Sequence, residues 1–310
     1  MKPAVVVLGA TGQVGLFTVA GLLEAGCEVL AVTRRPADHP ATGIEGLRRA
    51  GLAQVNELLN EAGDGSGFRA LLSCGPVALA GKLLDTSPGR DGGVWQRAVV
   101  VGTTSTRSKR SSADEGERRI IAEIEATLSA IRRRCEGEGI PLTLLHPTLI
   151  YGCGMDQNLT RIWRWIRRFG FAPIAAEASG FRQALHVADL ADTMIRAVQA
   201  EPALELESPV CGGSTLEYRE MVELLFDTAH RKRRFLRLPK ATFGAVAALS
   251  SLLPGAGRIT REMFARQSQD LVFDDGPARA RLGHAPRSFQ PSEADFRLPP
   301  AVQAIRHALR

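Results

Sequence analysis

The chain has 310 residues, with 39 Lys and Arg against 33 Asp and Glu, a formal net charge of +6. With 45% hydrophobic and 23% charged residues, the composition is that of an ordinary folded protein. It excludes collagen-like, disordered and disulfide-rich chains. The five cysteines are spaced singly, which predicts reduced thiols, a cytoplasmic location and no metal site. We expect no signal peptide and no membrane span, because no apolar run reaches ~18 residues.

The basic surplus consists mainly of arginine, because only five of the basic residues are lysines. There is no basic tail, zinc-finger spacing or stacking pattern for single strands, so nucleic acid is not an expected partner. We interpret the surplus as solvated helix faces plus a few arginines beside an anionic ligand.

The first 33 residues predict a strand–helix–strand unit. Ala4–Leu8 is a mostly β-branched run that ends at Gly9, which is typical of a strand buried on both faces of a parallel sheet. Apolar residues at helical spacing follow as far as Gly26, and Glu28–Thr33 forms the next predicted strand.

Further strands are predicted at Ala70–Ser73, 98–101 and 142–145, and one long helix over residues 115–135. Alternating strands and helices predict an α/β fold with a doubly wound parallel sheet of the Rossmann type. The segment 36–69 is weakly patterned, and no third strand is placed in it.

Beyond residue 150 the pattern is less regular. Helices are predicted at Leu159–Phe169, 186–200 and 216–229, the last with Ser214 or Thr215 as its N-cap. We therefore expect a dinucleotide-binding domain over residues 1–150. A smaller C-terminal substrate lobe, partly interleaved with the sheet, is expected over residues 151–310.

The sequence Gly-Ala-Thr-Gly-Gln-Val-Gly stands between the first predicted strand and helix. Its glycines permit a tight turn, close approach of a pyrophosphate and close helix–strand packing, and the free N–H groups of the helix then face the anion. Cys74 and Gly75 follow the strand Ala70–Ser73 and are expected at the same site. The motif supplies the other candidate cofactor-binding residues: Gly9, Thr11, Gly12, Gln13, Val14 and Gly15.

The end of the second strand indicates which dinucleotide is bound. A site for NAD usually has an acidic residue there, which binds the ribose 2′-hydroxyl. This chain has Thr33, Arg34 and Arg35 instead. Two guanidinium groups without a carboxylate suit a 2′-phosphate, which predicts NADP; the alternative is a pair of exposed loop arginines.

Four segments together resemble the extended short-chain dehydrogenases/reductases, in the branch of NAD-dependent epimerases and dehydratases. They are the glycine loop, Val-Gly-Thr-Thr-Ser at 101–105, His-Pro-Thr-Leu-Ile-Tyr-Gly at 146–152 and His-Val-Ala-Asp-Leu-Ala at 186–191. The resemblance implies hydride transfer on a carbonyl or secondary alcohol. It also implies a small-molecule substrate that is phosphorylated or nucleotide-linked, such as a sugar nucleotide, and a homodimer.

The chain departs from this family at the proton donor, a Tyr followed four residues later by a Lys. Its two tyrosines, Tyr151 and Tyr218, have Met155 and Val222 at that spacing. If the long helix is aligned with the family by Glu125 and Leu128, the Tyr and Lys positions fall on Glu117 and Ile121.

Other residues are candidates for the chemistry. Thr104 or Ser105 would take the place of the family's Ser or Thr and bind a substrate carbonyl, or merely satisfy backbone groups. Lys109 would replace the missing ammonium or bind substrate phosphate, unless it is a solvated loop residue. His146 is a candidate general acid or a packed strand-end residue. The resemblance implies that Tyr151 contacts the cofactor or packs behind it.

Two other functions remain open. Loss of the Tyr and Lys pair suits an NADP-binding sensor or assembly subunit without turnover. The basic run 231–234, followed by the apolar stretch 241–253, suits a peripheral membrane enzyme with a lipid substrate. We favour a core helix of the second lobe for the apolar stretch, and membrane contact is not the favoured interpretation.

Overall fold

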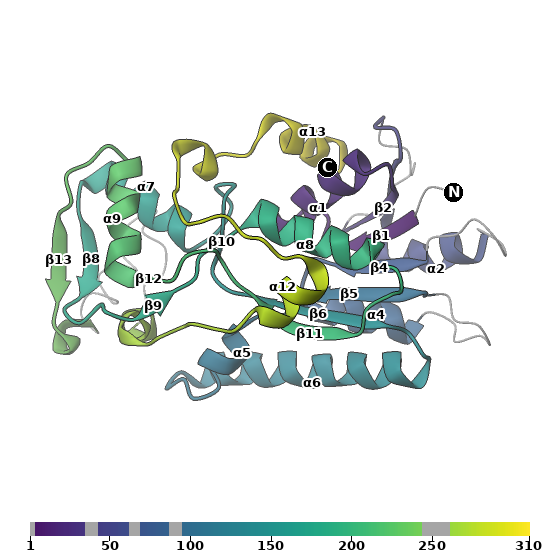
Figure 1. Ribbon diagram of the computed structural model, residues 1–310, viewed down its shortest axis with the longest axis horizontal. Coiled ribbons are helices and arrows are strands. Elements are labelled where there is room, and N and C mark those ends of the chain that lie inside the picture. Colours follow the sequence, from purple (N-terminus) through teal and green to yellow (C-terminus); the bar gives the residue numbers. More distant parts are fainter. Residues whose placement is uncertain (1–3, 35–42, 62–68, 87–94, 244–260) are drawn as a thin grey trace.

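The centre of the fold is a parallel sheet. The computed structural model describes residues 4–34, 43–61, 69–86, 95–243 and 261–310, and in them seven strands pair in the order β11-β6-β5-β4-β1-β2-β3 (Figure 1). This order confirms the doubly wound fold expected from the sequence. The strands are β1 (Ala4–Leu8), β2 (Glu28–Thr33), β3 (Leu47–Gly51), β4 (Ala70–Ser73), β5 (Arg97–Val101), β6 (Leu142–Pro147) and β11 (Leu206–Val210).

Alternating side chains of the strands enter two separate cores. In β1, Val5 and Val7 join one apolar cluster, whereas Val6 and Leu8 join the other, and all four are fully buried. A continuous apolar strand needs helices on both faces, which explains why the run contains no polar position. The strand that could not be placed from the sequence is β3, which pairs with β2.

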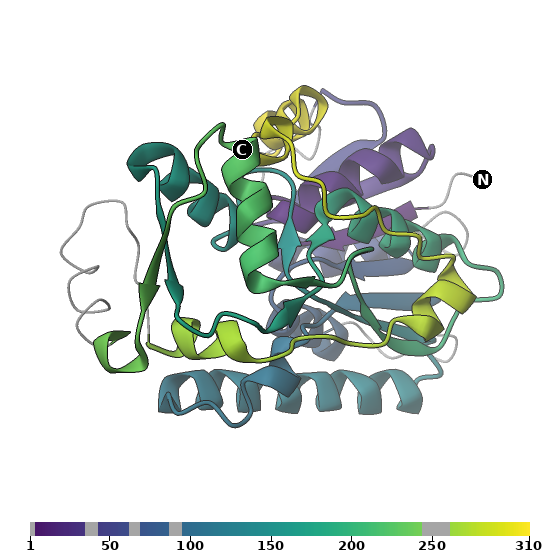
Figure 2. The same cartoon turned by 60° about the vertical axis from the view of Figure 1, so that its left-hand side comes forward.

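Helices cover both faces of the sheet (Figure 2). One layer contains α1 (Gln13–Glu24), α8 (Val187–Gln199), α12 (Gly276–Leu282) and α13 (Pro300–Ala308). The other contains α2 (Leu52–Glu61), α4 (Val77–Thr86) and α6 (Glu115–Gly137), and the short α5 (Ser105–Ser108) precedes α6. The long helix predicted over 115–135 is α6.

A smaller lobe stands at one end of the sheet (Figure 1). Its core lies around α7 (Leu159–Phe169) and α9 (Tyr218–Thr228), with both helix positions close to those predicted. None of the described helices is long and apolar enough to cross a membrane. Short strands pair beside α7 and α9. The pairs are β7 (Ile150–Tyr151) with β10 (Leu185–His186), β8 (Ala172–Ala175) with β13 (Phe235–Leu238), and β9 (Phe181–Arg182) with β12 (Leu216–Glu217).

The second half of the chain also completes the sheet layer. β11 pairs with β6 in parallel, and α8 packs against α1. After β13, α11 (Arg261–Ala265) and the short 3-10 helices η2 (Arg266–Ser268) and η3 (Glu293–Phe296) lead the chain toward α13. The lobe and the layers around the sheet are therefore interleaved.

The predicted N-cap of α9 is wrong. The helix begins at Tyr218, and Glu217 caps it through a capping box with Glu220. The hydroxyl of Ser214 instead accepts a hydrogen bond from the backbone N–H of Phe289, at 2.9 Å. A long-range backbone partner thus replaces the local capping role that the sequence pattern indicates.

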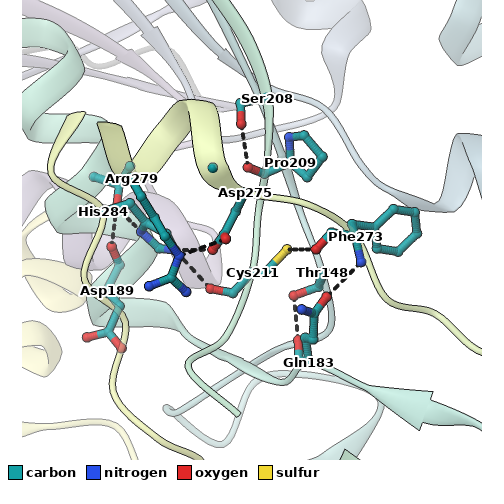
Figure 3. A network of polar contacts seen from close by, with 12 residues as sticks. Thr148, Gln183, Asp189, Ser208, Pro209, Cys211, Phe273, Asp275, Arg279 and His284 are labelled. Atoms are coloured by element: carbon teal, nitrogen blue, oxygen red, sulfur yellow. Dashed lines mark hydrogen bonds and ion pairs between the residues drawn. The ribbon is translucent and has the colours of Figure 1, made fainter. Parts of the chain in front are cut away.

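A buried histidine joins α12 to its neighbours (Figure 3). His284 donates from Nε2 to the Cys211 carbonyl at 2.8 Å, and its Nδ1 lies 2.7 Å from the Thr193 hydroxyl of α8. Asp275 is held by Arg279 at 2.7 Å. Burial lowers the pKa of His284 below its usual 6.5, against the opposing effects of the Cys211 carbonyl and Asp275.

This pKa shift predicts a loss of stability in mild acid. The unfolded chain binds a proton at His284 near pH 6.5 and the folded chain only at lower pH, so folding becomes less favourable as the pH falls below about 6.5. We expect a slope of up to ~1.4 kcal/mol per pH unit from this residue. Urea unfolding between about pH 7.5 and 5.5 measures it. His284→Gln should flatten the slope, and equal slopes in the two proteins would contradict the assignment.

Candidate functional site

A cleft of about 1000 Å³ opens where the strands of the sheet end and continues into the lobe. Gln13 and Val14 line it after β1, Cys74 and Gly75 after β4, and residues 102–105 after β5. Ligands of doubly wound sheets bind at this carboxyl edge. The predicted nucleotide loop and the predicted catalytic loop therefore face one cavity.

The glycine loop has the geometry of an anion site. Gly9 has a φ of 71°, and a Cβ on Gly15 would stand 2.2 Å from the Gly9 carbonyl oxygen. The first turn of α1 has no side-chain cap and no acidic residue. The amide nitrogen of Gln13 is shielded from solvent and has no hydrogen-bond partner in the described ranges. These features fit a bound pyrophosphate, which would accept hydrogen bonds from the backbone N–H groups of the first turn of α1 and from the side-chain Nε2 of Gln13.

Cys74 and Gly75 bring a second loop against the first. A Cβ on Gly9 would lie 2.6 Å from the Gly75 Cα, so the two backbones are in direct contact. Burial raises the pKa of the Cys74 thiol to about 12, although its contact with Thr18 opposes this. The cleft wall at Cys74 is therefore a neutral thiol.

The predicted 2′-phosphate site lies at the end of β2. Thr33 is half-buried and pairs with Gly51 of β3, and Arg34 is exposed directly after the strand. Arg34 forms no ion pair with a carboxylate in the described part of the chain, which leaves its guanidinium available to an anion. Arg35 falls outside the described residues.

The hydroxyls at the end of β5 differ in their availability. Thr104 donates to the Pro147 carbonyl at 3.0 Å, so its proton is already used. Thr103 accepts from the Ser105 backbone N–H at 3.0 Å and keeps its own proton. Thr103, Thr104 and Ser105 all line the cleft. Ser105 and Thr103 are therefore better placed than Thr104 to donate to a substrate carbonyl.

Glu117 holds two cations at the cleft wall. Its carboxylate lies 3.1 Å from Lys109 Nζ and 2.8 Å from Arg266 Nη1, and it accepts from the Ser112 hydroxyl at 2.7 Å. Lys109 and Arg266 line the cleft. Partial burial raises the pKa of Glu117, but hydrogen bonds from Ser112, Arg266 and Lys109 outweigh this and lower it to about 2. The carboxylate stays ionised at neutral pH.

His146 and Tyr151 do not line this cleft. His146 is buried with its Nε2 3.0 Å from Glu207, and it borders a separate cavity of about 280 Å³ beside α6. Burial lowers its pKa, against the effect of Glu207. Tyr151 is buried edge-on against His186 and Phe289. His146 is thus packed at the end of its strand, and Tyr151 packs against His186 and Phe289. The roles of both residues beside the cofactor stay predictions.

Sequence reasoning missed the cations of the lobe. Arg161, Arg182 and Arg266 line the cleft, as does Tyr218, whose pKa burial raises to about 12. The single acidic residue in the described lining, Asp156, accepts hydrogen bonds from Asn158 and Thr160 at the start of α7. These arginines are scattered along the sequence, so no local motif marks them. No cluster of His, Cys, Asp or Glu in the described ranges could hold a metal ion.

The same fold occurs in sugar-nucleotide epimerases. No protein-family model and no curated protein sequence matches the chain. It is similar to UDP-N-acetylglucosamine 4-epimerase from Bacillus cereus, with 14% identity, a TM-score of 0.65 and coverage of 99% of this chain and 95% of that one. It is also similar to a UDP-glucuronic acid 4-epimerase variant from Bacillus cereus in complex with NAD and a fluorinated UDP-sugar, with 11% identity, a TM-score of 0.68 and coverage of 98% of this chain and 99% of that one. For MoeE5 in complex with UDP-glucose and NAD, the identity is 17%, the TM-score is 0.64, and both chains are covered over 100% of their length.

Replacing Glu117 should destabilise the protein. Glu117→Gln leaves two partly buried cations without their carboxylate, which we expect to cost about 1–2 kcal/mol of unfolding free energy at neutral pH. The wild-type advantage should disappear as the pH falls from 4.5 toward 2, because the carboxyl is then protonated in both states. Glu125→Gln is the matched control: it removes an exposed pair with Arg110 and should cost about 0.5 kcal/mol or less. Equal losses in the two variants would contradict the assignment.

Proposed function

We propose that this chain is an NADP-dependent oxidoreductase or isomerase that transfers hydride to or from a carbonyl or secondary alcohol of a nucleotide-linked substrate. The observation that carries the proposal is the continuous cleft, which runs from an uncapped helix N-terminus to hydroxyl and ammonium groups. A dinucleotide at the first would reach toward the second. The homodimer, the cytoplasmic location and the division at residue 150 stay predictions.

The residues of the described chain fit the dinucleotide. The first turn of α1 and the Gln13 amide would hold the pyrophosphate, and Arg34 would hold the 2′-phosphate. Cys74 and Gly75 would border the middle of the bound dinucleotide. When bound, the nicotinamide ring supplies or accepts the hydride.

The chain itself supplies hydrogen bonds and a positive charge. Ser105, or Thr103 beside it, donates to the substrate oxygen, while Thr104 holds the loop against β6 through the Pro147 carbonyl. Lys109 stands four residues after Ser105 and is fixed by Glu117. Its ammonium stabilises negative charge that develops on the oxygen, and Lys109 or a bound water exchanges the proton.

The charges of the cleft favour an anionic substrate. Lys109 and five arginines line it against one acidic residue, Asp156. Arginine pairs with phosphate through two parallel hydrogen bonds. Two of the solved structures named above, the UDP-glucuronic acid 4-epimerase variant and MoeE5, hold UDP-sugars on the same fold. This set of cations is best suited to bind the diphosphate of a nucleoside diphosphate in the lobe.

The proposal predicts tighter binding of NADPH than of NADH. A well-formed contact between Arg34 and the 2′-phosphate implies a ten- to hundredfold preference, at the lower end because Arg34 is exposed. Fluorescence titration of both reduced cofactors measures it. Arg34→Ala should remove the preference, and Arg133→Ala, which removes an exposed arginine of α6, should keep it. Equal affinities in the wild type, or tighter binding of NADH, would refute NADP.

Turnover should not depend on either tyrosine. Tyr151 is buried away from the cleft. Tyr218 lines the cleft, but it has Val222 rather than a lysine four residues later, and burial raises its pKa to about 12. Tyr151→Phe and Tyr218→Phe should each keep turnover within about tenfold, assayed on whichever UDP-sugar the wild type converts with NADP. A loss of about three orders of magnitude with cofactor affinity unchanged would identify that tyrosine as a proton donor.

A further inference from the structure

The outer end of the lobe concentrates basic charge. Residues 159–169 and 230–243 contain ten of the 39 Lys and Arg and none of the 33 Asp and Glu. The remaining basic residues are outnumbered by acidic ones, so the positive charge of the whole chain arises here. Figure 1 shows β13 and β8 at the tip of the lobe, away from both termini.

The two segments lie against each other. Arg231 donates to the Arg167 carbonyl at 2.9 Å, and the Ala172 backbone N–H donates to the Arg234 carbonyl at 2.9 Å. These contacts bring the end of α7 together with the chain that enters β13. We call the exposed basic side chains gathered here the basic lobe patch: Arg167, Arg168, Arg231, Lys232 and Arg234.

The patch has no acidic counterpart. None of its five side chains forms an ion pair with a carboxylate in the ranges that the structure describes. The neighbouring Arg233 and Lys240 are excluded from the patch, because they form ion pairs with Asp227 and Glu177, respectively. Unpaired cations on one surface attract a polyanion over about a Debye length.

Large apolar side chains stand beside these cations. Phe169 is 45% and Leu236 50% exposed, and they are two of the five large hydrophobic residues exposed in the described chain. Leu236 pairs with Pro173 in the β8–β13 ladder, and Pro173 lies four residues after Phe169 in the sequence. Arginines interspersed with exposed aliphatic and aromatic side chains match the headgroup and acyl boundary of a bilayer. The backbone of a nucleic acid offers no partner for Leu236.

We propose that the basic lobe patch binds the surface of a membrane that contains anionic phospholipid. The cations contact lipid phosphates, and Phe169 and Leu236 insert at the level of the headgroups. Arg168 and Phe169 also line the cleft, so the mouth of the cleft would face the lipid. This inference does not depend on the proposed function.

Co-sedimentation of the full chain with vesicles tests the proposal. Binding should occur to vesicles that mix phosphatidylglycerol with phosphatidylcholine, fall with added salt, and be absent from pure phosphatidylcholine. Each basic residue near an anionic surface is worth about fivefold in binding, so Lys232→Glu with Arg234→Glu should weaken it at least about tenfold. Leu236→Asn should weaken binding with less change in its salt dependence.

A matched control distinguishes the effect of the basic lobe patch from the effect of the net charge of the protein. Arg119→Glu with Arg133→Glu makes the same charge change at exposed positions of α6 and should keep the binding. Circular dichroism and the melting temperature check that every variant is folded. The proposal is overturned if the wild type does not sediment with the anionic vesicles, or if the control variant loses as much binding as the patch variant. Equal or tighter binding of a DNA duplex at the same salt would also overturn it.

Discussion

The contact between the loops after β1 and β4 determines where the ligand edge of the sheet lies. Gly9 and Gly75 meet backbone to backbone, and Gly15 places α1 directly against the Gly9 carbonyl. A Cβ on Gly15 would push α1 away from the sheet, and a Cβ on Gly9 would force the two loops apart. Because α1 begins so close to the strand ends, its uncapped N-terminus faces the cleft, and the hydroxyls after β5 lie along the same edge.

The other end of the cleft is organised by charge. Glu117 is a single carboxylate with two cations and a hydroxyl around it, and removal of that carboxylate would leave the cations in mutual repulsion. Arg266 comes from η2, which packs against β8 of the lobe, whereas Lys109 and Glu117 come from the sheet side. One ion cluster therefore joins two walls of the cleft and holds the Lys109 ammonium group at the cleft wall.

The elements with strong local signals could be predicted from the sequence. Ala4–Leu8, Ala70–Ser73 and Leu159–Phe169 were placed at their observed bounds, because apolar runs and helical spacing are local features. β3 could not, because Leu47–Gly51 contains two arginines and a glycine and depends on its pairing with β2.

The candidate site divides in the same way. The glycine loop is a local motif, whereas Glu117 and Arg266 are 149 residues apart and meet only in the folded chain. The orientation of His146 follows from strand alternation, since it shares a face of β6 with Leu144, on the side covered by α6. A motif alone gives the position of that histidine along the strand but not the face on which it lies.

The interleaving of the two halves has a consequence for synthesis on the ribosome. Until β11 has emerged, β6 remains an open edge of the sheet, and until α8 has emerged, α1 lacks the helix that packs most extensively against it. A nascent chain that ends before residue 187 would thus expose both a strand edge and an apolar helix face, which are features that chaperones bind. The layers around the sheet can close only when most of the lobe has already left the exit tunnel.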